Sequence, residues 1–431
     1  MRSKSRLKAI PAIIYTALLI LVCASGPFHE APSDVKPLIG PAPAAEVTLS
    51  CGTYPVETTE LTAVIQSEDV PKLDELSYLT RADFSGSSCW KEIAEWGQAH
   101  PLLELKYTVT LPDGTVLDNS AAELDLSSLG HAAAAETAEA LACLPAVTHI
   151  KLGAQSAGSD ALTLADIGAI HEACPNAELD YRFTLYGHEI NLNDSALDFR
   201  GTEISDEAAA LNEVLPLMLR CSYLDMDNTG VSNEALAKIR EEFPNIDVVW
   251  RVWFGTNYSV RTDVERILAS KPTVGGMIYD VSVLQYCTKV KYLDIGHNDE
   301  LPSIDFARSM PELEVLIIAM TAVTDISPLE SCPKLEYLEI NSTNISDISP
   351  LKNSTGLHHL NIACCPEITD ISPLYGLTEL ERLWIGSQTP VPAEQVSAMK
   401  AAVPGCTINT TAYDPHDGAW RYTCLLYTSP S

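Results

Sequence analysis

Aliphatic residues recur in a fixed short pattern between Val290 and Gly386. Five segments fit the pattern LxxLxLxxN, and they read VKYLDIGHN, LEVLIIAMT, LEYLEINST, LHHLNIACC and LERLWIGSQ. They begin at residues 290, 313, 335, 357 and 380, so the repeat is 22 or 23 residues long. The alternation of aliphatic with other residues predicts a short β-strand in each segment, with the aliphatic side chains pointing inward.

Three of these segments continue into nearly the same phrase, TDISPL or SDISPL. Serine favours the position just before a helix, and proline suits the first helical position. The serines that we expect to cap short helices in this way are Ser327, Ser349 and Ser372. One repeat buries too little apolar surface to offset the ordering of its own chain, so the repeats must stack.

The asparagine position of the pattern is filled by a different residue in most repeats. Its occupants are Asn298, Thr321, Thr343, Cys365 and Gln388. Threonine and glutamine can still hydrogen-bond the backbone turn, whereas a cysteine does so poorly. We therefore expect the turn at Cys365, whose loop is one residue longer, to be the least regular.

The N-terminal half repeats on a longer period. HPLLELKYTVTLPDG, CPNAELDYRFTLYG and FPNIDVVWRVWFG begin at residues 100, 174 and 243, and they align at a proline and at Tyr107, Tyr181 and Trp250. The steps are therefore 74 and 69 residues. Short strand signals lie between these segments, and several precede helical stretches. Ser205 and Ser232 are the expected N-caps of two such helices. We expect right-handed strand and helix units that can stack with the regular repeats as one continuous sheet.

Residues 75–423 resemble the leucine-rich-repeat surface proteins of Gram-positive bacteria, and the SPL repeats at residues 290–386 are similar to those of internalins. The predicted fold class is α/β: a leucine-rich-repeat solenoid with a curved parallel sheet, a helix-bearing N-terminal half and an internalin-like C-terminal half. The resemblance implies export and the binding of a protein or glycan on the concave face. It implies no catalytic residue.

The chain ends suggest how the solenoid is delivered. Residues 1–26 read as an export signal or a membrane anchor, because basic residues precede an apolar run from Ala9 to Val22. Cys23 would be the lipidated residue of a lipoprotein, but Val22 stands where such signals carry a small residue. We expect an extracellular or cell-surface location, and attachment to a membrane or the cell wall stays open.

The remaining boundaries follow from composition and repeats. Residues 27–46 form a Pro-rich linker. Residues 47–289 form the irregular helix-bearing repeat region, and residues 290–423 hold the regular repeats with a terminal strand. Residues 424–431, CLLYTSPS, resemble a translated sequencing adapter and are expected to be non-native.

Charge and cysteine content exclude some functions. The formal net charge of −31 argues against a nucleic-acid partner. Cys174, Cys287 and Cys332 occupy one structural slot, two or three residues ahead of an expected strand, where a cysteine can act as a small buried hydrophobe. No CxxC pair occurs, and the disulfide state stays open.

No motif for catalysis or metal binding is present. The sequence lacks GxxxxGK[ST], HExxH and GxSxG, so we expect neither an enzyme nor a cofactor. Asp225 and Asp227 resemble the opening of a calcium loop, but the twelfth position is Leu236, so a repeat strand with its turn is favoured. His358 and His359 are adjacent and would face opposite sides of a strand, so no metal site is expected there.

The outward positions of the five regular strands form the candidate ligand-binding surface. They are Tyr292, Asp294, Val315, Ile317, Tyr337, Glu339, His359, Asn361, Arg382 and Trp384. A strand spacing of about 4.8 Å would make them one contiguous patch. Aromatic and arginine side chains are enriched at binding hot spots, and exposed apolar ones such as Ile317 and Trp384 are costly unless used.

The sequence thus predicts an exported module that binds a protein or glycan. In the simplest alternative, the aromatic residues merely cover the sheet. In another, the solenoid is a spacer that displays a module encoded beyond Thr423. A third, a hydrolase, would need a polar pocket between Lys106 and Phe254.

Overall fold

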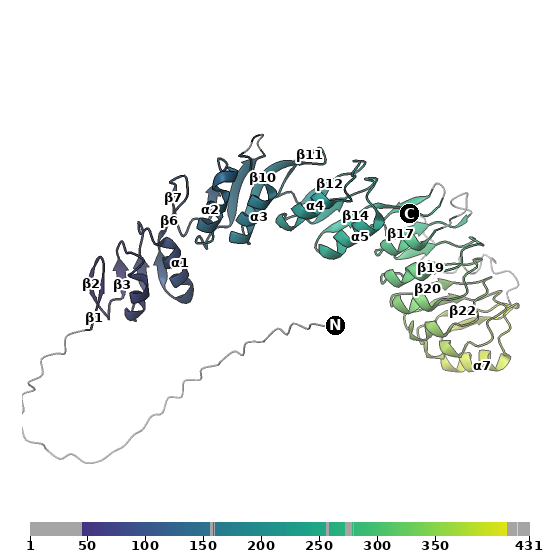
Figure 1. Ribbon diagram of the computed structural model, residues 1–431. Coiled ribbons are helices and arrows are strands. Elements are labelled where there is room, and N and C mark those ends of the chain that lie inside the picture. The colour runs from purple at the N-terminus through teal and green to yellow at the C-terminus, as the bar shows by residue number, and fades with distance from the viewer. Residues whose placement is uncertain are drawn as a thin grey trace, which may run out of the picture.

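The computed structural model describes residues 45–155, 158, 160–255, 258–271, 278, 280–411 and 420. The expected leader, almost all of the expected linker and the expected adapter-derived tail lie outside these residues. The described chain forms an elongated arc of stacked strand and helix units, which runs from β1 and β2 in purple to α7 in yellow (Figure 1).

An antiparallel hairpin covers the first end of the solenoid. It consists of β1 (Glu46–Leu49) and β2 (Gly52–Pro55). Val47 and Leu49 point into the core while their neighbours on β1 are exposed, so the hairpin has one apolar and one polar face. A terminal element of this kind shields the apolar edge of the first repeat from water.

Three modules of three parallel strands follow. The first contains β3 (Glu60–Thr62), η1 (Val70–Glu75), β4 (Arg81–Asp83), α1 (Trp90–Ala99) and β5 (Glu104–Lys106), and ends in β6 (Thr108–Thr110) and β7 (Val116–Asp118). The second contains β8 (Glu123–Asp125), α2 (His131–Leu141), β9 (His149–Ala154), α3 (Leu164–Ala173) and β10 (Glu178–Leu185), and ends in β11 (His188–Asn191). The third contains β12 (Ala196–Asp198), α4 (Ala209–Val214), η2 (Leu215–Leu217), β13 (Tyr223–Asp225), α5 (Asn233–Glu242) and β14 (Asp247–Val249), and ends in β15 (Arg251–Trp253) and β16 (Ser259–Arg261).

The long sequence period corresponds to these modules. Tyr107, Tyr181 and Trp250 are all buried where the third parallel strand of a module leads into its hairpin. The Tyr107 hydroxyl donates to the carbonyl of Cys143 (2.6 Å), and the Trp250 indole donates to the side chain of Asn233 (2.8 Å). Tyr107 therefore ties the end of the first module to the residues after α2 of the second, and Trp250 ties the end of the third module to its own α5.

The prediction of one continuous sheet is wrong. Each module ends in an antiparallel pairing, β6 with β7, β10 with β11, and β15 with β16. These hairpins turn the chain back before the next parallel strand begins. The parallel strands therefore form separate sheets of β3 to β5, β8 to β10 and β12 to β14, with β11 added to the second.

The regular repeats form a seven-stranded parallel sheet. Its strands are β17 (Arg266–Leu268), β18 (Tyr292–Asp294), β19 (Val315–Ile317), β20 (Tyr337–Glu339), β21 (His359–Asn361), β22 (Arg382–Trp384) and β23 (Thr407–Asn409). The connecting helices are η3 (Ser282–Tyr286), η4 (Asp305–Ser309), η5 (Ser327–Ser331), η6 (Ser349–Asn353), η7 (Ser372–Gly376) and α7 (Ala393–Ala402). A strand is present in each of the five predicted segments.

The central residue of each regular strand builds the core. Leu293, Leu316, Leu338, Leu360 and Leu383 are each at most 1% exposed. They belong to one continuous hydrophobic cluster that extends from Val47 to Val403. Stacking therefore buries the apolar surface that one repeat could not bury alone.

The predicted cysteine slot is confirmed. Cys174, Cys287 and Cys332 are buried and form no disulfide. Burial raises the pKa of the Cys287 thiol to about 12 and that of Cys332 to about 11. The Cys332 thiol donates to the carbonyl of Ala307 in the preceding repeat (3.4 Å), so the slot also links neighbouring repeats.

The backbone turns after β19, β20 and β21 follow one geometry. Met320, Ser342 and Cys364 have φ values of +56°, +57° and +57°. The prediction that the turn at Cys365 is the least regular is therefore wrong for its backbone. The Cys365 thiol donates to the carbonyl of Ile340 (3.2 Å), and its amide donates to Thr389 (3.2 Å).

Threonines supply the hydrogen bond to the backbone at this turn in three of the repeats. Thr321 and Thr343 donate to the carbonyls of Ile318 (2.8 Å) and Ile340 (2.7 Å). In the last repeat, Thr389 rather than Gln388 is buried in this role and donates to the carbonyl of Ile362 (2.8 Å). A buried carbonyl needs a donor, and the shorter threonine supplies it.

The prediction that serine caps the SPL helices is wrong. Ser327, Ser349 and Ser372 are the first residues of η5, η6 and η7, and their side chains accept no capping bond. The aspartates two residues earlier accept from the serine amides at 2.7, 2.8 and 2.9 Å, and also from the serine hydroxyls at 3.0 Å. They are Asp325, Asp347 and Asp370.

Serine N-caps were also predicted for α4 and α5, and at α4 an aspartate again takes the role predicted for serine. Ser232 is the N-cap of α5 and accepts from the amide of Ala235 (3.3 Å), as predicted. Ser205 caps nothing, because α4 begins only at Ala209. The Asp206 carboxylate instead accepts from the amides of Ala208 (3.1 Å) and Ala210 (3.0 Å).

We predict that Asp347→Ala lowers the free energy of unfolding by about 1 kcal/mol, because η6 loses its capping acceptor. Hydrogen bonds from Ser349 lower the pKa of Asp347, so its contribution is present above the ordinary aspartate pKa and is lost as the pH falls through the lowered value. Urea unfolding at neutral pH measures the change. Glu330→Ala, which removes an exposed carboxylate from η5, is the control, and an equal loss in both variants would contradict the capping role.

Candidate functional site

The ten predicted ligand-binding residues lie on one face of the seven-stranded sheet. They are the first and third residues of β18 to β22, whose register aligns them in two columns. The first column holds Tyr292, Val315, Tyr337, His359 and Arg382, and the second holds Asp294, Ile317, Glu339, Asn361 and Trp384. We call this the outer face, because the central residues of the same strands point into the core on the other side.

The prediction that these side chains are exposed is wrong for most of them. Seven are buried, namely Val315, Ile317, Tyr337, Glu339, His359, Asn361 and Trp384. Only Tyr292, Asp294 and Arg382 are half-buried. Whether the ten residues bind a ligand stays a prediction, but the outer face is not an open aromatic surface.

Trp420 packs against the outer face and contributes to this burial. It follows the last strand by 11 residues, counted from Asn409, and is only 2% exposed. It joins Val315, Ile317, Ala319, Tyr337 and Trp384 in a hydrophobic cluster that is separate from the core. Its ring centroid lies 5.1 Å from that of Trp384 and 5.6 Å from that of Tyr337. We call this group of side chains the tryptophan cluster.

A buried carboxylate lies beneath the aromatic rings. Glu339 is 2% exposed, and one of its oxygens accepts from the Trp420 indole N–H (2.8 Å) and from the Tyr337 hydroxyl. A buried carboxylate is costly unless donors replace its water. Tyr337 and Trp420 supply two such donors, so the position of Trp420 is fixed by a polar group as well as by packing.

Arg382 borders the same cluster. Its guanidinium lies 4.5 Å from the centroid of the Trp420 ring and 5.8 Å from that of Trp384. One guanidinium nitrogen donates to the backbone carbonyl of Trp420 (2.9 Å). Arg382 therefore contacts both the ring and the backbone of the same residue.

His359 contacts the rings from the neighbouring strand. Its ring centroid is 5.9 Å from that of Tyr337 and 6.5 Å from that of Trp420. Burial, assisted by the nearby Arg382 cation, lowers the pKa of His359, although Glu381 opposes the shift. The neutral imidazole is therefore the form that fits this cluster.

Two of the predicted residues accept hydrogen bonds from backbone amides. The Asp294 carboxylate accepts from the amide of Gly296 (3.1 Å), and the Asn361 side chain accepts from the amide of Ala363 (3.0 Å). Tyr292, at the far end of the columns, packs against the tryptophan cluster and carries the guanidinium of Arg266 over its ring (4.5 Å). The ten positions thus divide into a central cluster and a more polar margin.

Asp225 and Asp227, which the sequence assigned to a repeat strand and its turn, belong to an ion-pair network. Arg251 pairs with Asp227 (3.0 Å), and Arg261 pairs with Asp225 (3.0 Å) and Asp227 (3.5 Å). These arginines compensate the charge that a calcium ion would otherwise neutralise. Among the residues that the structure describes, no group of three or more His, Cys, Asp or Glu side chains is placed to hold a metal ion.

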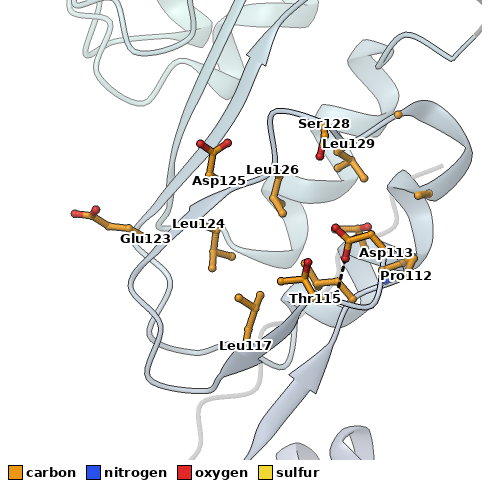
Figure 2. A pocket seen from close by; sticks show the side chains of 14 residues that line it. Pro112, Asp113, Thr115, Leu117, Glu123, Leu124, Asp125, Leu126, Ser128 and Leu129 are labelled. Atoms are coloured by element: carbon orange, nitrogen blue, oxygen red, sulfur yellow. Dashed lines mark hydrogen bonds between the residues drawn. The ribbon is translucent and has the colours of Figure 1, made fainter.

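A cavity of about 180 Å³ lies where the first module meets the second, within the range that a hydrolase would have to use. Figure 2 shows Leu117 of the hairpin facing Leu124 of β8, while Glu123 and Asp125 point away from the space. The Asp113 carboxylate accepts a hydrogen bond from the amide of Thr115 (2.8 Å). The lining contains neither histidine nor cysteine, so it offers no imidazole or thiolate for nucleophilic catalysis.

Sequence reasoning missed Trp420, Ala319 and Arg266. Ala319 and Arg266 lie just outside the ten positions that were considered. Ala319 lies two residues after the last residue of β19, and Arg266 lies on the neighbouring strand β17, where it pairs with Tyr292. Trp420 carries no periodic signal. Its only mark in the sequence is an aromatic residue in AWRY beyond the last repeat.

Comparison with known proteins agrees with this description. Residues 311–353 match the family model described as Leucine Rich repeats (2 copies). The comparison with curated proteins gave no match. Together with the strand register, the matched segment defines the class: an α/β solenoid of leucine-rich repeats.

Several solved bacterial structures are similar to the chain. An internalin from Listeria monocytogenes is 15% identical, with 84% of this chain and 86% of that chain covered and a TM-score of 0.29. Internalin C2 from the same species is 17% identical, with 61% and 82% covered and a TM-score of 0.28. A leucine-rich-repeat protein of Leptospira interrogans is 12% identical, with 78% and 91% covered and a TM-score of 0.32. At such TM-scores no residue of the outer face can be matched to a counterpart.

Among the described helices, none has the length and apolar character that crossing a membrane requires.

We predict that acidification destabilises the tryptophan cluster through His359. Its pKa is lower in the folded than in the unfolded chain, where the ordinary value is about 6.5, so the unfolded chain binds more protons at mildly acidic pH. The stability is full above that ordinary value and falls as the pH drops below it. Urea unfolding at pH 7.5 and 5.5 should show a smaller pH effect in His359→Gln than in the unaltered protein. Identical pH effects in the two proteins would refute the role of His359.

Proposed function

We propose that this protein is exported from a bacterial cell and binds a protein or glycan ligand through the outer face of its seven-stranded sheet. The face is a row of side chains from five strands, and solenoids of this class present such extended surfaces for recognition. The proposal concerns binding rather than catalysis.

One observation carries the proposal: the outer face already holds a side chain that comes from outside the repeats. Trp420 contacts Tyr337 and Trp384 by its ring, Glu339 by its N–H and Arg382 by its carbonyl. The hydrogen bond between Trp420 and Glu339 joins residues 81 positions apart. A surface that merely covered the sheet would need packing, but not this combination of an acceptor, a cation and several aromatic rings in contact.

The half-buried margin of the outer face provides the cleanest test of ligand binding. Tyr337 and Trp384 are unsuitable, because their replacement by alanine would also remove buried contacts of the tryptophan cluster. Tyr292 lies at the edge of the cluster and is half-buried, so its removal disturbs the fold less.

We predict that Tyr292→Ala weakens ligand binding by about tenfold or more, with little change in the thermal midpoint. The measurement is biolayer interferometry against a panel of immobilised surface proteins and surface glycans. Tyr375→Ala is the matched control, since Tyr375 is also half-buried but lies in η7 and packs against the core. Ligands that bind equally well after Tyr292→Ala, or that are lost equally after Tyr375→Ala, would exclude the outer face.

Export is proposed from the leader, where basic residues precede the apolar run from Ala9 to Val22. We predict that Leu19→Arg, which places a charge within this run, retains the full-length protein inside the cell. Immunoblots of cell and culture or envelope fractions from a bacterial host measure the distribution. Thr48→Arg, outside the leader, controls for the added charge. Unchanged export of Leu19→Arg would remove this part of the proposal.

A further inference from the structure

The surroundings of Trp420 define a site for one particular side chain. The ring, the indole N–H and the main-chain carbonyl of Trp420 each have a partner there. The ring packs on Tyr337 and Trp384, the guanidinium of Arg382 lies over it at 4.5 Å, and the indole N–H donates to Glu339 at 2.8 Å. The main-chain carbonyl accepts from Arg382 at 2.9 Å.

The indole N–H is the feature that distinguishes tryptophan from other apolar residues at this site. Phenylalanine or leucine could fill the space but would leave the buried Glu339 carboxylate with one donor fewer. An unmet buried acceptor is penalised more strongly than a missing apolar contact of the same size. The site therefore selects an aromatic ring that carries a hydrogen-bond donor.

Polar atoms next to the site point to a polypeptide as its ligand. Within the described part of the chain, Nε1 of Trp384 and Nδ2 of Asn361 are buried without a hydrogen-bond partner. Both residues belong to the outer-face column that contains Glu339. Buried donors in a native protein are normally paired, and the carbonyl groups of a peptide backbone are acceptors that would pair with them.

Trp420 occupies this site from within the same chain. It is tethered to the solenoid, which raises its local concentration at the outer face. A ligand that uses the same contacts must compete with it, so its apparent affinity falls by the fraction of molecules in which the site is open. Removal of the Trp420 side chain should therefore expose the site to added ligand.

From these contacts we propose that the outer face carries a tryptophan-binding site, that Trp420 fills it in the unliganded protein, and that the partner is a polypeptide that inserts a tryptophan in place of Trp420. This inference rests on the proposed function and names the chemistry of its ligand. Tyr337, Glu339, Arg382 and Trp384 are the residues that recognise the inserted tryptophan.

The test uses the full chain with Trp420→Ala and N-acetyl-L-tryptophanamide as the probe, followed by isothermal titration calorimetry. We expect saturable binding to Trp420→Ala and binding at least about tenfold weaker to the unaltered protein, because its site is filled. Trp253→Ala, which removes a tryptophan that is 55% exposed on β15, should bind the probe as weakly as the unaltered protein.

Two further comparisons test the recognition chemistry. In the Trp420→Ala background, Glu339→Gln should weaken probe binding by about tenfold, because a carboxylate accepts the N–H bond more strongly than an amide. The 1-methyl derivative of the probe, which lacks the N–H, should bind Trp420→Ala more weakly by a similar factor. Equal binding of the two probes would overturn the role assigned to Glu339.

Folding of the variants is checked by the sharpness of their thermal transitions. Trp420→Phe keeps a ring but lacks the donor, and should bind the probe more tightly than the unaltered protein even if Trp420→Ala folds poorly. Failure of both variants to bind the probe better than the unaltered protein would overturn the inference.

The outcomes separate this inference from the proposed function. A ligand that depends on Tyr292 but is not displaced by the probe from Trp420→Ala would overturn the tryptophan site and leave the proposed function in place. Competition between that ligand and the probe supports both. A concentration-dependent dimer that Trp420→Ala abolishes, seen by light scattering, would identify a second copy as the source of the inserted tryptophan and overturn the assignment to a different polypeptide.

Discussion

The structure depends on the contact between the central leucines of successive parallel strands. Leu316, Leu338 and Leu360 are fully buried only because each lies between repeats that present the same residue in the same register. A single repeat has no such neighbours and cannot offset the entropy of ordering its chain. The array therefore stops only where another element covers its edge, as the β1–β2 hairpin does at the first end. The same register fixes the outer face, because the residues that flank each leucine must align in two columns.

The outer face has the opposite problem, because stacking cannot bury it. Val315 and Ile317 point away from the core, and no further strand can lie over them within the array. Their cover must come from elsewhere, and within the described residues Trp420 belongs to the same cluster. Its indole donates to Glu339, so one residue both shields apolar side chains and satisfies a buried carboxylate. The contacts that cover the outer face are therefore the same contacts that recognise the side chain of Trp420.

The sequence patterns predicted those features of the fold that depend on residues close together in the chain. The alternation around Leu338 predicted its strand and its inward side chain, and the long period marked the modules through Tyr107, Tyr181 and Trp250. The pattern could not separate parallel from antiparallel pairing, because both have the same alternation, so the hairpins that divide the sheet were missed. Asp347 and Ser349 are both good acceptors near a helix start, and only the backbone conformation decides that aspartate acts. Trp420 was missed because it belongs to no repeat and lies 81 positions away from Glu339 in the sequence.

The buried carboxylate also bears on how an array with a simple repeat can be selective. Apolar side chains such as Val315 and Ile317 favour almost any ring that covers them, since dispersion and area burial discriminate weakly between similar shapes. Glu339 adds a penalty for every occupant that lacks a donor at the right place, of about 1 to 3 kcal/mol for an unmet buried group. Selectivity then comes from the cost of the wrong occupant rather than from extra attraction to the right one. Because the buried Glu339 comes from one strand, a single residue in one repeat is enough to make this part of the sheet face selective.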